Sequence, residues 1–227
     1  MKAILAEISF FEAHFKVHYT KTFRLSYPIP LPTTITGIFG ALLGIDRKDI
    51  LNQFSNLYLG AKLIRPFKEN FESFTFIQIP WDIKKKGTWP PGIVPLQLLN
   101  EPSYQLVVAG PNNQIDNYYQ QLKKSFIYLP YGGQNDFFVK DIKILKTVEV
   151  EEKFILENYA PKNLVDKVEV INEEGAFLIT LPVMHKFIPK EDPFYFGYKV
   201  RIYLKEKIPT VNGIGLYELS KFYYPNQ

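Results

Sequence analysis

The chain has 227 residues, of which 46% are hydrophobic and 22% charged, a composition typical of a folded protein rather than a disordered one. It contains no cysteine and only three histidines, which excludes a disulfide framework, a thiolate metal site and a cysteine nucleophile. Residues 1–110 carry 12 Lys and Arg against 8 Asp and Glu and so hold the whole net charge of +4, which favours an anionic partner there.

The first segment, Ala3–Val17, is rich in strand-forming residues and predicts a long or bulged β-strand. Basic and aromatic residues follow, and no acid lies between residues 13 and 45. Cations for phosphates beside rings for bases are typical of single-stranded nucleic-acid binding. A solvated strand end followed by core aromatics fits the same pattern, so both interpretations stay open. The predicted RNA-contacting residues here are Lys16, Lys21, Arg24 and Tyr27.

Three prolines between residues 28 and 32 predict an extended approach to a helix, because proline lacks an amide donor and restricts the residue before it. The apolar run Ile35–Leu43 predicts the helix, with Thr33 or Thr34 as its N-cap and Gly44 at its C-terminal end. Small residues on this helix favour the close approach of another backbone; they are Gly37, Gly40 and Ala41.

The rest of the chain continues as a β-α-β-β-α-β series, the pattern of a ferredoxin-like α+β fold. After residue 150 the pattern changes to short strands separated by turns, either a small β-rich region of its own or strands packed on the first sheet. The predicted helices are 48–54 and 115–126, and the predicted strands are 57–64, 71–79, 104–109, 137–150, 176–180, 198–204 and 217–219.

An irregular stretch from residue 80 to residue 92 interrupts this series and predicts an exposed hairpin or long loop. It holds both tryptophans of the chain on either side of three consecutive lysines. Exposing tryptophan is costly, so this loop is expected to meet a nucleic acid or a neighbouring protein, unless both rings fold back onto the domain. The residues of this predicted contact are Trp81, Lys84, Lys85, Lys86 and Trp89.

No other motif indicates chemistry. His14 and His18 share one face of the predicted strand, but without nearby acids a surface or packing role is favoured over a metal or catalytic site. His185 stands alone, and no glycine-rich phosphate loop is present. We predict no cofactor and no metal. No apolar run reaches the roughly 18–20 residues of a membrane span, and Glu7 comes too early for a signal peptide. We therefore expect a cytoplasmic chain without a membrane partner.

The stretch Phe23–Gly44, with the sequence FRLSYPIPLPTTITGIFGALLG, resembles the N-terminal signature of the fifth CRISPR-associated (Cas) protein family. That signature is a Phe-Arg pair, a proline-rich approach and a Pro-Thr-x-x-x-Gly-x-x-Gly-Ala helix start. A second stretch, Leu129–Phe137, is similar to the family's turn before a strand, although Gly-Gly replaces Leu-Gly and Asn-Asp replaces Ser/Cys-Glu/Asp. The resemblance covers residues 1–150.

This resemblance implies a RAMP-type subunit of type I Cascade that serves antiviral defense. It implies an RRM-like domain over 1–150, with a β-hairpin thumb inserted at about 65–100, and a β-rich region over 151–227. Such subunits cap the 5′ handle of the crRNA and contact the backbone RAMP subunit and the large subunit. The Arg24 region and the start of the helix would face the handle, which adds three RNA-binding residues: Thr33, Thr34 and Gly37.

Two alternatives remain. One branch of the family processes crRNA with tyrosine, lysine and histidine, and Tyr27, Lys21 and His18 are the candidates for a metal-independent endoribonuclease here. The predicted thumb lacks a histidine, so we expect no catalysis. The other alternative is a RAMP-like scaffold that acts mainly through protein contacts.

Overall fold

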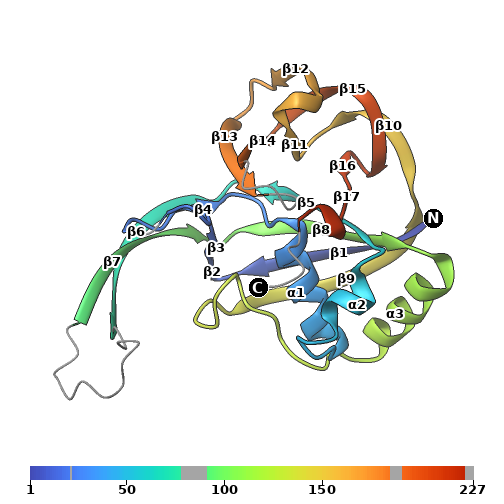
Figure 1. Cartoon of the computed structure of the whole chain (residues 1–227), viewed down its shortest axis with the longest axis horizontal. Helices are drawn as coiled ribbons and strands as arrows, with labels where there is room; N and C mark the ends of the chain where they lie inside the picture. The colour runs from blue at the N-terminus through green and yellow to red at the C-terminus, as the bar shows by residue number, and fades with distance from the viewer. Residues whose placement is uncertain (21, 78–90, 185–190, 223–227) are drawn as a thin grey trace.

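The computed structural model describes residues 1–20, 22–77, 91–184 and 191–222, and its centre is a five-stranded sheet (Figure 1). The strand order is β17-β5-β8-β1-β9, and all neighbouring strands are antiparallel. The strands are β1 (Lys2–Phe10), β5 (Tyr58–Arg65), β8 (Ser103–Gly110), β9 (Val139–Glu149) and β17 (Tyr217–Glu218).

Both faces of this sheet are covered, which explains why successive residues of β1 are buried, among them Ala3, Ile4, Leu5 and Ala6. Ile4 and Ile8 point to the face covered by helices and pack in one cluster with Phe39. Ala3 and Leu5 point to the opposite face and pack with residues of the C-terminal strands. Figure 1 shows the helices below the sheet and the C-terminal strands above it; the helices are α1 (Pro32–Leu43), α2 (Ile50–Phe54) and α3 (Asn112–Lys124).

The predicted first strand, residues 3–17, is divided into three pieces because its hydrogen-bond partners change along the chain. After β1, the amide of Phe11 donates to the carbonyl of Phe138, and the amide of His14 donates to the carbonyl of Gly132. The strand therefore leaves the central sheet and enters two smaller ones. The pieces after β1 are β2 (Glu12–Ala13), which pairs with β7, and β3 (Phe15–Lys16), which pairs with β4 (Ser26–Tyr27).

The predicted helix is confirmed, and so is its end at Gly44, which adopts the left-handed conformation with φ 70°. Its predicted N-cap is wrong. The cap is Leu31, followed by Pro32 at the first helical position, and no side chain caps the helix. Proline at this position has no amide to satisfy, so the threonines after it lie inside the first turn.

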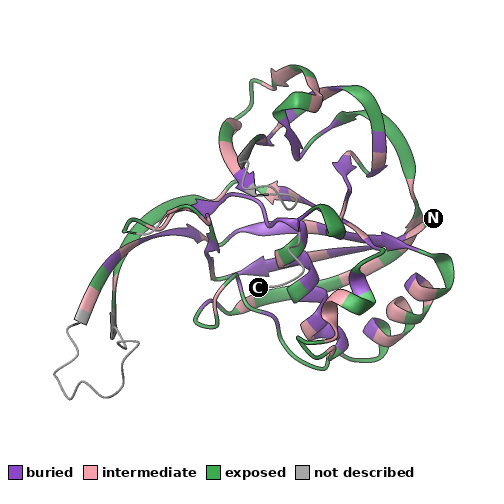
Figure 2. Ribbon diagram, in the orientation of Figure 1, coloured by how far each residue is buried: buried purple, intermediate pink, exposed green. Residues whose placement is uncertain are grey.

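A long hairpin projects from one end of the central sheet (Figure 1) and forms a three-stranded sheet of order β2-β7-β6. Its arms are β6 (Lys68–Ile77) and β7 (Pro91–Asn100). Figure 2 shows most of residues 68–75 of β6 exposed, whereas several residues of β7 are buried. The hairpin lies within the predicted insertion at 65–100. The β7 strand itself was not predicted, because Pro91 and Pro95 indicate a loop.

The C-terminal part is β-rich, as predicted, but it holds more strands than the sequence indicated. Two small sheets have the orders β10-β15-β12 and β11-β14-β13, and β17 pairs with β5 of the central sheet. The elements are β10 (Glu151–Leu156), β11 (Tyr159–Pro161), η1 (Lys162–Leu164), β12 (Val165–Val170), β13 (Phe177–Met184), β14 (Glu191–Tyr198), β15 (Val200–Val211), β16 (Ile214–Gly215) and η2 (Leu219–Lys221).

The fold is thus α+β and predominantly β. In the part of the chain that the structure describes, no helix is long and apolar enough to cross a membrane. Buried residues of the first 150 positions and of the C-terminal part join in one hydrophobic cluster, so the two parts share a core.

Candidate nucleic-acid interface

A groove of about 590 Å³ lies between α1, β3 and the loop that precedes β9. It brings together three of the residues predicted from the sequence, Lys16, Thr34 and Gly37. Its described lining includes no acid, so Lys16 gives it a positive charge. The opposite wall is formed by Tyr128, Leu129 and Tyr131.

Backbone contacts hold this loop against α1 at one end and against His14 at the other. At one end, the amides of Ile127 and Tyr128 donate to the carbonyls of Leu42 and Ala41, which are C-terminal carbonyls of α1. At the other end, Gly133 has φ 98° and packs so closely on the carbonyl of His14 that a Cβ atom would collide with it. The loop is therefore fixed by its backbone, and its side chains are free to face outward.

The side chains of this loop are unusually exposed for their size. Tyr128 is 65% exposed, Leu129 63% and Tyr131 49%. Across the groove, Gly37 faces open space, since no atom lies within 4 Å of the position a Cβ would take there. An aromatic wall, a lysine and a bare helix surface suit a single strand whose bases stack on rings while its backbone approaches the helix.

Arg24 lies apart from this groove, beside the middle of the hairpin strand β7. Its amide donates to the carbonyl of Pro95, and its carbonyl accepts from the amide of Gln97, so it extends the hairpin sheet. The neighbouring Phe23 places its exposed ring 5.1 Å from that of Phe71 on β6. The predicted basic patch is therefore divided between two sites.

The remaining predicted residues differ in their exposure. Thr33 is exposed on the first turn of α1, next to the groove. Tyr27 is buried: its ring packs on Phe196 and its hydroxyl donates to the carbonyl of Pro182 at 2.8 Å. Five further predicted positions and the loop lysine Lys21 lie outside the described residues; the five are Trp81, Lys84, Lys85, Lys86 and Trp89.

The histidines do not form a metal site with acids: no cluster of three metal-binding side chains occurs among the described residues. His14 is fully buried, and its Nδ1 lies 2.9 Å from the carbonyl oxygen of Gln97, so Nδ1 carries the proton. Burial lowers the pKa of His14, with a smaller contribution from the positive charges of Arg24 and Lys16, while the bond to Gln97 opposes the shift. His14 is therefore a packing residue, as expected.

His18 and Tyr27, two candidates for the endoribonuclease alternative, do meet. The His18 Nδ1 atom lies 3.2 Å from the hydroxyl oxygen of Tyr27. Because that hydroxyl donates to Pro182, it accepts from His18, which is the arrangement of a structural contact.

Tyr128 and Tyr131 were not predicted as site residues. Leu129–Phe137 was predicted as a turn, but nothing in the sequence connected that turn to α1. One available signal was the Gly132-Gly133 pair next to a run of large apolar residues. Glycines can hold a loop close to the rest of the protein, so that the large side chains beside them face a binding partner.

Comparisons with known proteins bear on the fold. No protein-family model matches the chain, and neither does any curated protein. A chain described as part of a "CRISPR RNA-guided surveillance complex" aligns with a TM-score of 0.53 and 16% identity, covering 92% of this chain and 91% of that one. This chain therefore shares its fold with a chain of that complex, as the predicted resemblance to a CRISPR-associated family implies.

Two weaker similarities carry no argument by themselves. A chain described as "Crystal structure of Cas protein" gives a TM-score of 0.37 at 14% identity over 59% of this chain and 57% of that one. A chain of a type III-B Cmr-beta complex bound to cognate target RNA and AMPPnP gives 0.41 at 13% identity over 89% and 86%.

Proposed function

We propose that this chain is a non-catalytic subunit of a type I CRISPR Cascade complex, in which it binds and caps the 5′ handle of the crRNA. The groove of Lys16, Gly37, Tyr128 and Tyr131 carries the proposal, because it lies where the Phe23–Gly44 signature meets the Leu129–Phe137 turn. The shared fold with a chain of a surveillance complex supports it.

The finer fold assignment is part of this proposal. Residues 1–150 would form the ferredoxin-like RAMP domain, whose four main strands follow the order β9-β1-β8-β5 with α1 and α3 as the two connecting helices. The β6–β7 hairpin would be the thumb inserted into it. Residues 151–227 would form the C-terminal region that covers the second face of the sheet.

The groove would hold unpaired nucleotides rather than a duplex. Exposed tyrosines offer faces on which bases stack, at about 1–3 kcal/mol per base, and Lys16 would neutralise a phosphate. Gly37 would let the sugar-phosphate backbone approach α1 without a side chain in the way. Selectivity for the handle would come from the shape of this site.

The hairpin would act at the junction between handle and spacer and against neighbouring subunits. It projects beyond the central sheet (Figure 1), and Arg24 with the exposed rings of Phe23 and Phe71 lies along its middle. A contact through the lysines and tryptophans of residues 81–89 remains a prediction from the sequence. The backbone RAMP subunit and the large subunit remain the expected protein partners.

The salt dependence of RNA binding tests the proposal. Replacing Lys16→Ala should weaken binding of a single-stranded handle RNA and reduce the slope of log affinity against log salt by roughly 0.7, the value for one lost phosphate contact. Lys153→Ala, at an exposed lysine of β10 that pairs with Glu151, is the matched control. Equal slopes for both variants would contradict a phosphate contact in the groove.

The second candidate function is a crRNA endoribonuclease, favoured only by the His18–Tyr27 contact. Incubating the chain with repeat RNA in EDTA distinguishes the two functions, because metal-independent cleavage would give a discrete product that His18→Ala abolishes. We expect the RNA to remain intact.

A further inference from the structure

Exposed aromatic rings continue from the groove around the edge of the central sheet. Tyr131, on the wall of the groove, lies 6.4 Å from the ring of Phe138 in an edge-to-face arrangement. Phe138 is joined to Phe11 by a backbone hydrogen bond from the Phe11 amide, at 3.2 Å. Phe11 is 55% exposed and Phe138 63%. These three rings form a path, which we call the aromatic track.

The aromatic track ends at a second pocket, on the face of the sheet that the helices do not cover. Lys140 connects the two, because its Nζ lies 5.7 Å from the centre of the Phe11 ring and its side chain also lines the pocket. The pocket has a volume of about 280 Å³ and lies between the ends of β1, β5, β8 and β9 at the root of the hairpin. Three cations line it, Arg65, Lys68 and Lys140, against one acid, Glu101.

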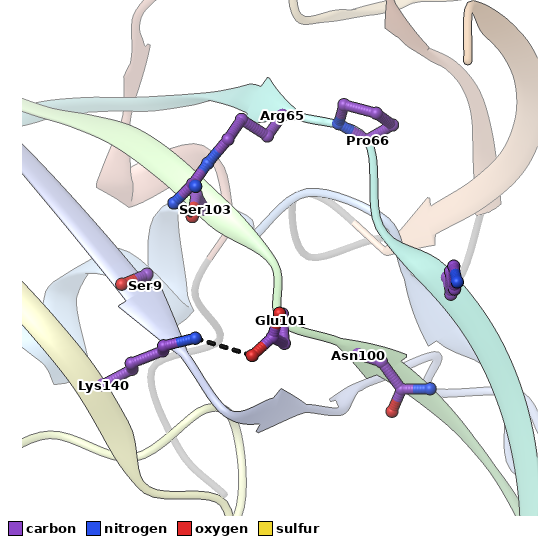
Figure 3. A pocket seen from close by; sticks show the side chains of 8 residues that line it. Ser9, Arg65, Pro66, Asn100, Glu101, Ser103 and Lys140 are labelled. Atoms are coloured by element: carbon purple, nitrogen blue, oxygen red, sulfur yellow. Dashed lines mark hydrogen bonds and ion pairs between the residues drawn. The ribbon is translucent and has the colours of Figure 1, made fainter.

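The side chains of this pocket offer donors suited to a phosphate. Figure 3 shows Arg65 lying over Ser103 and Lys140 pointing toward Glu101. Arg65 Nη2 donates to the Ser103 hydroxyl at 2.8 Å, which uses one of the five guanidinium N–H groups. Ser103 and Ser9 are almost fully buried at the base of the pocket, and each adds a hydroxyl that can donate.

We infer that a single RNA strand leaving the groove crosses the aromatic track and places a backbone phosphate in the Arg65 pocket. This inference rests on the proposed function and extends it, from one site to a path around the edge of the sheet. A run of exposed rings with cations at both ends suits RNA, because each ring can stack on a base and the cations can meet phosphates. The excess of cations over acids in the pocket is complementary to an anionic group such as a backbone phosphate.

Glu101 competes with a phosphate for Lys140 in this pocket. Its carboxylate binds Lys140 at 2.6 Å, so a phosphate would have to share that lysine with the glutamate. Removing the carboxylate charge would release Lys140 for the phosphate and take away a nearby like charge. Glu101→Gln is therefore expected to strengthen RNA binding severalfold, which loss of structure would not do.

A length series of single-stranded RNAs tests the path. Fluorescence anisotropy of the full chain should show affinity rising in a step once the strand is long enough to reach from the groove to the pocket. Arg65→Ala and Phe138→Ala should each remove this step, lowering affinity for long strands roughly tenfold, while short strands bind as they do to the wild type. Phe154→Ala is the matched control, since Phe154 is also exposed beneath a lysine, with Lys207 Nζ at 5.4 Å, but lies on β10.

The possible outcomes separate the two proposals. If the wild type binds short handle RNA but shows no step with length, or if Arg65→Ala keeps the step, the path is wrong and the groove stands. If Phe138→Ala leaves RNA binding intact and instead weakens assembly with neighbouring subunits, the aromatic track is a protein interface. If the wild type binds no RNA of any length, the proposed function fails and this inference fails with it.

Discussion

Tyr128 and Tyr131 present their rings on either side of Pro130, at the wall of the groove. A tyrosine buries its ring wherever a core can receive it, so two largely exposed tyrosines in one short loop indicate a surface that meets a partner. The backbone of this loop is already fixed by α1 at one end and by the backbone of His14 at the other, which lowers the entropy lost on binding.

Replacing Tyr128→Ala should therefore weaken binding of single-stranded handle RNA by about 5- to 150-fold, which corresponds to one lost stacking contact of about 1–3 kcal/mol. Tyr128→Phe keeps the ring and should bind like the wild type. Fluorescence anisotropy at fixed salt measures both. An affinity unchanged by the alanine would remove Tyr128 from the site.

His14 makes stability depend on pH. Its Nε2 atom is buried and has no hydrogen-bond partner among the described residues, so a proton there would be an unsatisfied buried donor. Its folded pKa is lowered, chiefly by burial, and so lies below the value of 6.5 in the unfolded chain. Between these two pKa values the unfolded state binds more protons, so the free energy of unfolding falls as pH decreases through 6.5.

Urea denaturation at pH 7.5 and pH 5.5 measures this contribution. The wild type should lose more stability on acidification than His14→Asn, which keeps a side-chain amide to donate to Gln97 but does not titrate. The difference has an upper bound of about 1.4 kcal/mol per pH unit. Equal losses in both proteins would show that folding does not change the pKa of His14.

At the scale of single elements, α1 has two faces with opposite tolerance for side chains. At Gly40 an added Cβ would lie 2.9 Å from the Cδ1 of Ile50, whereas at Gly37 it would meet open space. Glycine in the middle of a helix costs roughly 0.5–1 kcal/mol relative to alanine. The bare surface at Gly37 therefore lowers the stability of the helix without serving its packing.

Gly37→Ala separates binding from stability. It should raise the free energy of unfolding by roughly 0.5–1 kcal/mol, because the alanine favours the helix and collides with nothing. It should also weaken RNA binding, because the methyl group would stand where the RNA backbone approaches. Denaturation and anisotropy on the same protein measure the two effects. A variant that gains stability and binds RNA like the wild type would exclude close approach at this position.

The elements that local sequence determines were predicted, and those determined by distant partners were not. The helix at Ile35–Leu43 and its end at Gly44 follow from a proline entry, an apolar run and a glycine. The break after β1 arises because Phe11 and His14 bond to residues more than a hundred positions away. The strand β7 was not predicted because its prolines indicate a break in regular structure. In the fold, β6 and Arg24 both pair with that strand.

In the candidate site, too, positions set by local sequence were predicted and contacts between distant segments were not. Thr34 and Gly37 were predicted as site residues from the family resemblance, and the helix that begins at Pro32 brings them to one face because they are three residues apart. Tyr128 and Tyr131 reach that face through backbone bonds to the end of α1, a contact that no local pattern encodes. Arg24 was grouped with Lys16 by sequence, but its pairing with β7 carries it to the hairpin instead.

At the scale of the whole molecule, the central sheet separates two surfaces that the proposals use differently. The groove lies on the helix side, the Arg65 pocket lies on the other side, and the edge at Phe11 and Phe138 connects them. The C-terminal strands share a core with the first 150 residues and cover much of the sheet face opposite the helices. An RNA strand on that face would therefore be confined to the end of the sheet near the hairpin.

The central claim is that this chain recognises the 5′ handle of a crRNA, and a direct comparison of two RNAs tests it. The affinity of the full chain is measured for a crRNA with its 5′ handle and for an RNA of equal length in which an unrelated sequence replaces the handle, at equal ionic strength. We predict clearly tighter binding of the RNA that has the handle, and loss of that preference in Tyr128→Ala. Equal affinity for both RNAs would contradict the account.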